Sequence, residues 1–180
     1  MIDDRSSKVV FLAHCLLNTN TKYRGSLKGG SRYSSVAPGL IQLLNKYDLG
    51  IEQMPCPEIG IAEIDREPRT KDMYDTEDMR KACKMYSEFV KKMIEKFEKG
   101  KVKVFGIIGV SRSPTCGIST TYVGKDLETA RIQPGAGIFM EELKSVLKEK
   151  GLEFMEYDQK DITRSLNEIE KKIKFVKSVV

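Results

Sequence analysis

The sequence predicts an α/β fold: one three-layer, Rossmann-like or flavodoxin-like sandwich with a mostly parallel sheet of four or five strands. Two observations favour this class. Short apolar runs rich in β-branched residues alternate with longer segments whose apolar residues recur at helical spacing. The apolar runs are also nearly continuous, which is typical of strands covered on both faces. Because strands that alternate with helices join through right-handed crossovers, they build an open parallel sheet between two layers of helices.

Strands and helices are expected in strict alternation along the whole chain. The strands are expected at residues 8–15, 51–56, 101–110 and 152–158. The helices are expected at residues 36–47, 79–97, 139–147 and 162–176. The polar connections are expected to be irregular, and the first is long enough to be a binding loop. They cover residues 18–35, 57–75 and 119–137. No repeat, low-complexity segment or linker divides residues 1–180, so we expect a single α/β domain.

Composition limits the classes of protein to which the chain can belong. Its 180 residues are 40% hydrophobic and 32% charged, which is the balance of a globular protein. The net charge of +5 is mild, and many lysines fall on expected outer helix faces, so we expect no nucleic-acid polymer as a partner. No apolar run reaches the roughly 18 residues of a membrane span, and the start "MIDDRSSK" is acidic rather than signal-like. We therefore expect a cytoplasmic protein without a membrane partner.

Three of the four cysteines follow three different strands of the expected sheet. Cys15 ends the first strand, Cys56 ends the second, and Cys116 lies just beyond the third. In a flavodoxin-like strand order, 2-1-3-4, these strands are neighbours, and ligands bind at the carboxyl ends of such strands. The three thiols are therefore expected to converge. Cys83 lies on the apolar stripe of a helix, where we expect a buried, inert thiol.

Three converging thiols favour metal chemistry over a disulfide, which a reducing compartment disfavours. A closed structural zinc site needs four protein ligands, and the one histidine, His14, excludes sites with two imidazoles. Three thiolates suit an iron–sulfur cluster with one iron unligated by protein, or a metal whose open position holds substrate. The alternative is that the three cysteines are unrelated small core residues.

Other uses of a cysteine agree less well with the sequence. A cysteine phosphatase loop needs arginine six places after the cysteine, where this chain has Thr21. A papain-like pair would need His14, which points away from Cys15 if both lie on one strand. His14 is instead expected in the core or in a hydrogen bond. The segment "GISTTYVGK" has the wrong spacing for a phosphate-binding P-loop, and no GxGxxG follows the first strand.

Several short motifs resemble those of the 2-thiouracil desulfurase family. They are "AHCLLN" with "KYRG", "QMPCPE" with "EPR", "SRSPTCG" and "GAGIF", and they run in the family's order through most of the chain. The resemblance implies a [4Fe–4S] cluster held by Cys15, Cys56 and Cys116. It also implies a desulfurase (desulfidase), of lyase or hydrolase type, that replaces C=S by C=O in a small thiolated compound such as 2-thiouracil. The chain is a divergent member, with Asn18 where the family more often has glycine and "IGIAEID" after "CPE".

Two carboxylates and two hydroxyls are candidates for the catalytic chemistry. Glu58, beside Cys56, or Glu52, four places before it, is expected to deprotonate the attacking water. Ser113 or Ser111 is expected to donate a hydrogen bond to the substrate or to a cluster sulfide. Each has a structural alternative: Glu52 faces solvent, Glu58 caps a helix or pairs with Arg69, and the serines shape a turn.

Two further functions remain open at the level of sequence. One is a non-catalytic iron–sulfur or metal protein that senses, stores or delivers sulfide or metal. The other is a nucleotide-binding α/β protein whose cysteines are structural. A carboxylate within reach of the open iron would favour the enzyme over the carrier.

Overall fold

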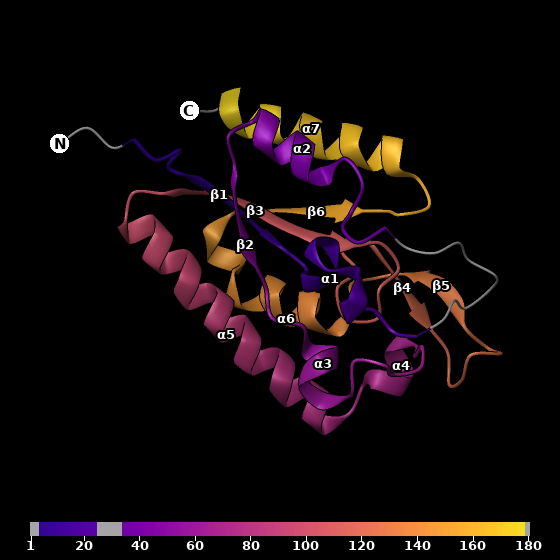
Figure 1. The fold of residues 1–180 in the computed structure, drawn as a ribbon. Coiled ribbons are helices and arrows are strands. Elements are labelled where there is room, and N and C mark those ends of the chain that lie inside the picture. The colour runs from indigo at the N-terminus through magenta and orange to yellow at the C-terminus, as the bar shows by residue number, and fades with distance from the viewer. Residues whose placement is uncertain (1–3, 25–33, 179–180) are drawn as a thin grey trace.

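A computed structural model describes residues 4–24 and 34–178 of the chain. Its centre is a four-stranded parallel sheet with the strand order β2-β1-β3-β6 (Figure 1). The strands are β1 (Lys8–Leu12), β2 (Gly50–Gln53), β3 (Lys103–Val110) and β6 (Glu153–Tyr157). This is the flavodoxin-like 2-1-3-4 order, one of the two arrangements that the sequence favours, and it places the first three strands side by side.

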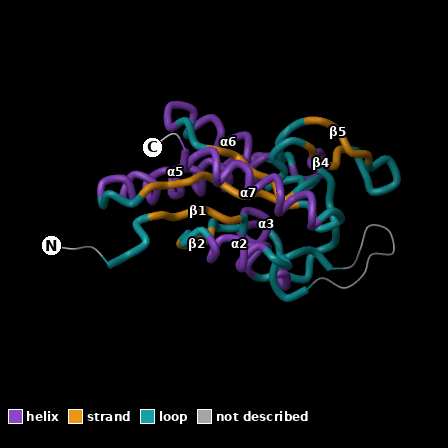
Figure 2. The backbone as a smooth tube through the Cα atoms, turned by 90° about the horizontal axis from the view of Figure 1, so that it is seen from above, coloured by secondary structure: helices purple, strands orange, loops and turns teal. Residues whose placement is uncertain are grey.

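Helices cover both faces of the sheet (Figures 1 and 2). The long helix α5 (Glu77–Lys99) packs with α6 (Ile138–Val146) on one face. On the other face α2 (Leu40–Lys46) lies with α7 (Ile162–Ser178). The architecture is therefore the predicted three-layer α/β sandwich. Among the described residues, no helix combines the length and the apolar composition needed to cross a bilayer.

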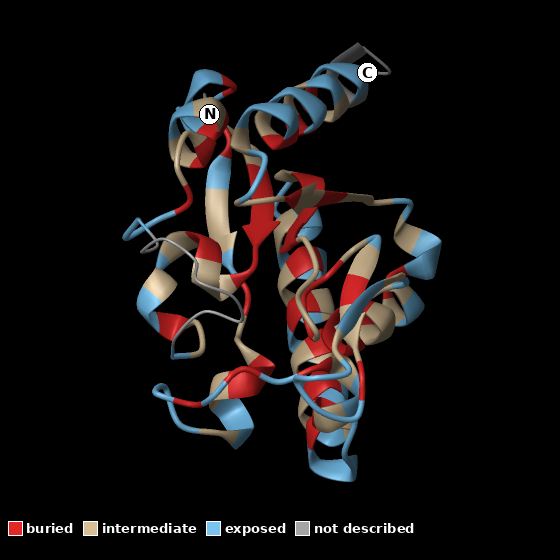
Figure 3. Cartoon of the chain, turned by 90° about the vertical axis from the view of Figure 1, so that its right-hand side faces the viewer, coloured by how far each residue is buried: buried red, intermediate tan, exposed pale blue. Residues whose placement is uncertain are grey.

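The core lies where the helices meet the sheet, as the buried central strands in Figure 3 show. Residues 104–110 of β3 are all buried, because this strand has a neighbour on each side and helices above and below. Thr76 is the N-cap of α5, where its side chain accepts a hydrogen bond from Met79 N, and Gly100 is the C-cap. Its buried face includes Cys83, as its apolar stripe predicts.

Three expected boundaries are wrong by a few residues. The first strand ends at Leu12, and the short helix α1 (His14–Leu17) follows and carries Cys15. The second strand ends at Gln53, and Cys56 is instead the N-cap of α3 (Pro57–Ile61), where a proline fits the first turn. The first long helix begins only at Leu40, because Gly39 before it takes a left-handed φ of 72°.

Irregular connections were expected where the structure has additional short elements. The segment 119–137 forms the antiparallel hairpin β4 (Thr120–Val123) and β5 (Arg131–Pro134). The others are η1 (Thr19–Thr21), α4 (Lys71–Tyr74) and η2 (Lys148–Lys150). Half of the expected binding loop, residues 25–33 of 18–35, lies outside the described residues.

Candidate functional site

The structure brings three cysteines to one cavity of about 480 Å³ at the carboxyl ends of the strands. Cys15 comes from α1 after β1, Cys56 from the start of α3 after β2, and Cys116 from the loop after β3. Ligands of open parallel sheets bind at this edge. The cavity therefore brings together the three thiols that the sequence predicts to converge.

The three thiols are removed from water and close enough to influence one another. Cys116 is buried, while Cys15 and Cys56 are half-buried. Burial raises the pKa of Cys56 to about 12. Burial also raises the pKa of Cys116, and the neighbouring Cys15 and Cys56 add to that rise. Metal binding would replace the protons on these thiols, because the thiolate is the ligand.

Cys83 is separate from this group. It does not line the cavity, is fully buried on α5, and lies with its Sγ 3.6 Å from Met79 Sδ. Burial raises the pKa of this thiol to about 12. Cys83 therefore packs as a core residue, as the helical stripe predicts.

A buried ion pair joins Glu58 and Arg66 at the wall of the cavity. Their side chains are only 9% and 5% exposed. Arg66 Nη2 and Nε donate to Glu58 Oε2 at 2.6 and 3.0 Å. The Tyr74 hydroxyl donates to the same oxygen at 3.3 Å. This is a correction to the expected pairing of Glu58 with Arg69, which instead lies over the Tyr74 ring.

The ion pair is the centre of a hydrogen-bond network that reaches each cysteine-bearing segment. Arg66 Nη2 donates to the carbonyl of Thr21, which follows the helix of Cys15. Glu58 is two residues after Cys56. Its Oε1 accepts a hydrogen bond from Thr115 Oγ1 at 2.6 Å, and Thr115 precedes Cys116. One buried pair thus connects three segments that are far apart in the sequence.

The sequence of this chain is similar to those of known proteins. The family model described as putative 2-thiouracil desulfurase matches residues 7–130, more than half of the chain. The chain belongs to the putative 2-thiouracil desulfurase family. It is also 29% identical over 175 residues to the uncharacterized protein MJ0003 of Methanocaldococcus jannaschii, covering 94% of this chain and 99% of that protein.

The fold of this 2-thiouracil desulfurase family member is similar to a solved structure. That structure is the [4Fe-4S]-dependent thiouracil desulfidase TudS, with a TM-score of 0.53 and 15% sequence identity. The alignment covers 91% of this chain and 99% of the solved one. At this identity the likeness supports the three-layer α/β fold.

The four candidate catalytic residues of this family member differ in their relation to the cavity. Glu58, Ser111 and Ser113 line it, whereas Glu52 lies on the edge strand β2 and is not part of the lining. Ser113 Oγ accepts a hydrogen bond from Cys116 N at 2.9 Å and so shapes the turn that holds Cys116. His14 was expected in the core or in a hydrogen bond. It starts α1, is half-buried and lines the cavity, so it is not a core residue, while the hydrogen bond stays a prediction.

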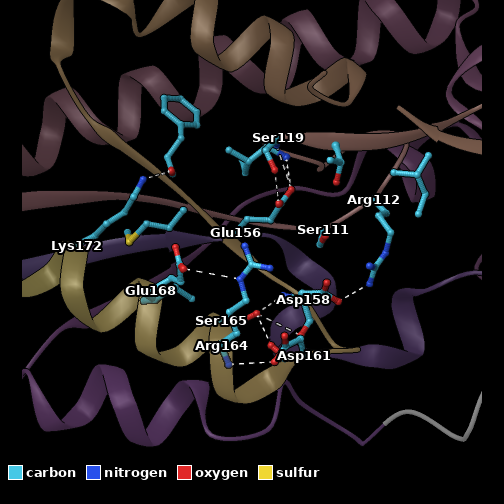
Figure 4. A pocket seen from close by; sticks show the side chains of 16 residues that line it. Ser111, Arg112, Ser119, Glu156, Asp158, Asp161, Arg164, Ser165, Glu168 and Lys172 are labelled. Carbon is cyan, nitrogen blue, oxygen red and sulfur yellow. Dashed lines mark hydrogen bonds and ion pairs between the residues drawn. The ribbon is translucent and has the colours of Figure 1, made fainter. Parts of the chain in front are cut away.

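The Cys116 loop is also held from the side of β6, in a second cavity of about 520 Å³ (Figure 4). Glu156 accepts hydrogen bonds from Ile118 N at 2.8 Å and from Ser119 Oγ at 2.6 Å. At the start of the loop, Arg112 forms an ion pair with Asp158. Both ends of the loop are thus attached to the end of β6.

Sequence reasoning missed Arg66, Thr115 and the basic character of the cavity. Glu58 is the one carboxylate among the described residues that line it, and the basic side chains outnumber it. These basic residues are Lys22, Arg66, Arg69, Arg112 and Lys160. Thr115 stands in the motif "SPTCG", but Arg66 carries no pattern that distinguishes it from Arg69 nearby. The lining favours ligands that carry negative charge or hydrogen-bond acceptors.

Proposed function

We propose that this protein is an iron–sulfur-dependent desulfidase that converts C=S to C=O in a small thiolated compound such as 2-thiouracil. One observation carries the proposal: three cysteines from three separate strand ends line one cavity in a chain of the putative 2-thiouracil desulfurase family. Such a cluster needs a reducing compartment, so a cytoplasmic location belongs to the proposal.

The residue types at the cavity suit a three-cysteine [4Fe–4S] cluster, because three thiols line it and the one histidine is its only imidazole. Among the described residues, no group of three or more His, Cys, Asp or Glu side chains is arranged to hold a metal ion, so the family carries the assignment of the cluster. Cys15, Cys56 and Cys116 would hold it. When bound, it supplies a Lewis-acidic iron without a protein ligand, which polarises a thiocarbonyl group.

Glu58 is the residue we propose to accept a proton from the attacking water. It is the only carboxylate among the described residues of the cavity lining. Its Oε2 already accepts from Arg66 and Tyr74, whereas Oε1 accepts only from Thr115 among the described residues. A carboxylate oxygen has two lone pairs, so Oε1 has room for a water.

The reaction balances as a hydrolysis without change of oxidation state. The water oxygen bonds to the thiocarbonyl carbon and loses a proton to Glu58. The C–S bond then breaks, and sulfur leaves with its electron pair and that proton as hydrosulfide. The second proton of the water is released from the added hydroxyl to solvent as C=O forms. Ser111 lines the cavity and is proposed to orient the substrate, while Ser113 orients Cys116 through its amide. The catalytic role of Glu52 stays a prediction, and its side chain does not line the cavity.

The test is anaerobic reconstitution with iron and sulfide, followed by incubation with 2-thiouracil. Wild-type protein is expected to bind the cluster and to release hydrosulfide. The changes Cys15→Ala, Cys56→Ala and Cys116→Ala are expected to abolish the cluster, whereas Cys83→Ala keeps it. Glu58→Gln is expected to lower the turnover per bound cluster at least about 100-fold, the usual contribution of a general base.

Two outcomes separate the alternatives. Wild-type protein that binds neither iron nor sulfide would rule out the cluster. A cluster without hydrosulfide release above a cluster-free control would instead favour the sulfide or metal carrier.

A further inference from the structure

Arg66 is the most extensively bonded side chain at the cavity, and one of its nitrogens is unused. Nη2 donates to Glu58 and to the Thr21 carbonyl, and Nε donates to Glu58 and the Tyr74 hydroxyl. Nη1 is buried and has no hydrogen-bond partner among residues 4–24 and 34–178. Buried donors without an acceptor are rare and costly in folded proteins, and the bonds of Nη2 and Nε hold Arg66 in place in spite of that cost.

The bonded nitrogens of Arg66 reach segments that each carry a cysteine. The Thr21 carbonyl belongs to η1, which directly follows the helix of Cys15. Glu58 lies in the first turn of α3, whose N-cap is Cys56. Through Glu58 the network continues to Thr115 Oγ1 and hence to the turn of Cys116.

We propose that Arg66 is a positioning residue that fixes the relative placement of the three cysteine-bearing segments. The proposal rests on the proposed function, since it takes the three thiols to hold one cluster. A guanidinium suits this role because its donors form a rigid planar fork.

The variant that tests this role is Arg66→Lys. Lysine keeps a positive charge beside Glu58 but cannot donate to several acceptors in fixed directions. Arg80→Gln is the matched control, because Arg80 is also an ion-paired arginine, with Asp75 and Glu141, but does not line the cavity. Circular dichroism and thermal melting confirm that both variants fold.

The first readout is hydrogen exchange in the cluster-free protein, which does not depend on any cofactor. Arg66→Lys is expected to speed amide exchange at least about tenfold in all three cysteine-bearing segments, 13–24, 54–62 and 111–118. Arg80→Gln leaves these segments unchanged. A purely local role of Arg66 would change exchange only in its own connection, residues 62–69, and that result would overturn the positioning proposal.

The second readout uses the reconstituted protein. Arg66→Lys is expected to lose iron to a chelator at least about tenfold faster than wild type. An unchanged rate of iron loss in folded Arg66→Lys would count against the positioning role. If wild-type protein binds no cluster, the proposed function fails, while the exchange data still decide the positioning role.

Discussion

A single hydroxyl, that of Thr115, connects the Cys116 turn to the buried ion pair. Thr115 is 1% exposed, and its Oγ1 donates to Glu58 Oε1 at 2.6 Å. Because the acceptor is charged and buried, this bond is stronger than one between neutral groups. The contact shows why threonine, rather than a residue of the same shape without a donor, suits this position.

Thr115→Val removes that donor while it keeps the shape of the side chain. We expect the free energy of unfolding of the cluster-free protein to fall by about 1–3 kcal/mol, the usual cost of leaving a buried group unsatisfied. Urea denaturation measures it. Thr115→Ser, which keeps the hydroxyl, should recover most of the loss. Thr129→Val, at an exposed hydroxyl, should change stability by less than about 0.5 kcal/mol. Equal stabilities for Thr115→Val and Thr129→Val would contradict this account.

The connection between β3 and α6 carries Cys116 in a tightly packed turn. A side chain at Gly109 would place its Cβ 2.3 Å from the Cys116 carbonyl oxygen. At Gly137, the N-cap of α6, it would lie 2.4 Å from the Thr115 carbonyl carbon and 2.9 Å from Cys116 N. Gly137 has an ordinary φ of −70°, so the requirement here is space rather than backbone freedom. This contact gives a structural reason for the second glycine of "GAGIF".

Gly137→Ala is therefore expected to displace the Thr115–Cys116 peptide. Overpacking of this kind costs about 1–3 kcal/mol of stability, and the reconstituted protein should also retain less iron and sulfide per chain. Thermal melting and iron analysis check both effects. Gly100→Ala, at the end of α5 with its nearest atoms 3.3 Å from the added Cβ, should keep the cluster. Full iron retention in Gly137→Ala would show that the turn can relax.

The layer formed by α2 and α7 is held together by contacts between parts of the chain that are far apart in the sequence. Glu170 of α7 accepts hydrogen bonds from Lys46 Nζ at 2.7 Å and from the Tyr47 hydroxyl at 2.6 Å. These contacts connect α7 to α2, which lie side by side in Figure 1. The Lys46 ammonium, followed by the Tyr47 hydroxyl, lowers the pKa of Glu170 to about 2.

This shift predicts a pH dependence of the whole molecule's stability. A carboxyl group whose pKa is lower in the folded state stabilises the fold above its unfolded pKa of 4.5 and loses that effect as the pH falls towards about 2. Wild type should thus be more stable than Glu170→Gln at pH 6, and the difference should shrink on acidification through this range. Melting temperatures from pH 2 to 6 measure it. Glu168→Gln, at a loose exposed ion pair, should show a smaller difference. A difference that is constant with pH would rule out the ionised contact as its cause.

Much of the framework could be predicted from the sequence, because burial of a strand or helix face leaves a periodic pattern in the chain. The alternation of apolar runs predicted a mostly parallel sheet with helices on both faces, and the flavodoxin-like order considered for it is the order β2-β1-β3-β6 of the structure. The motifs around Cys15, Cys56 and Cys116 identified the residues that line the cavity, and the stripe on α5 set Cys83 apart. The predicted single domain stays a prediction.

Only the tertiary structure decided which polar groups meet at the cavity. Arg66 rather than Arg69 pairs with Glu58, Thr115 joins them, and Glu52 lies outside the lining. The sequence pattern also did not predict the hairpin of β4 and β5. The physical reason is the range of the interactions. The periodicity of apolar residues shows which face of a helix or strand is buried. The partner of a buried charge depends instead on which irregular connections, from different strands, meet at the same edge of the sheet.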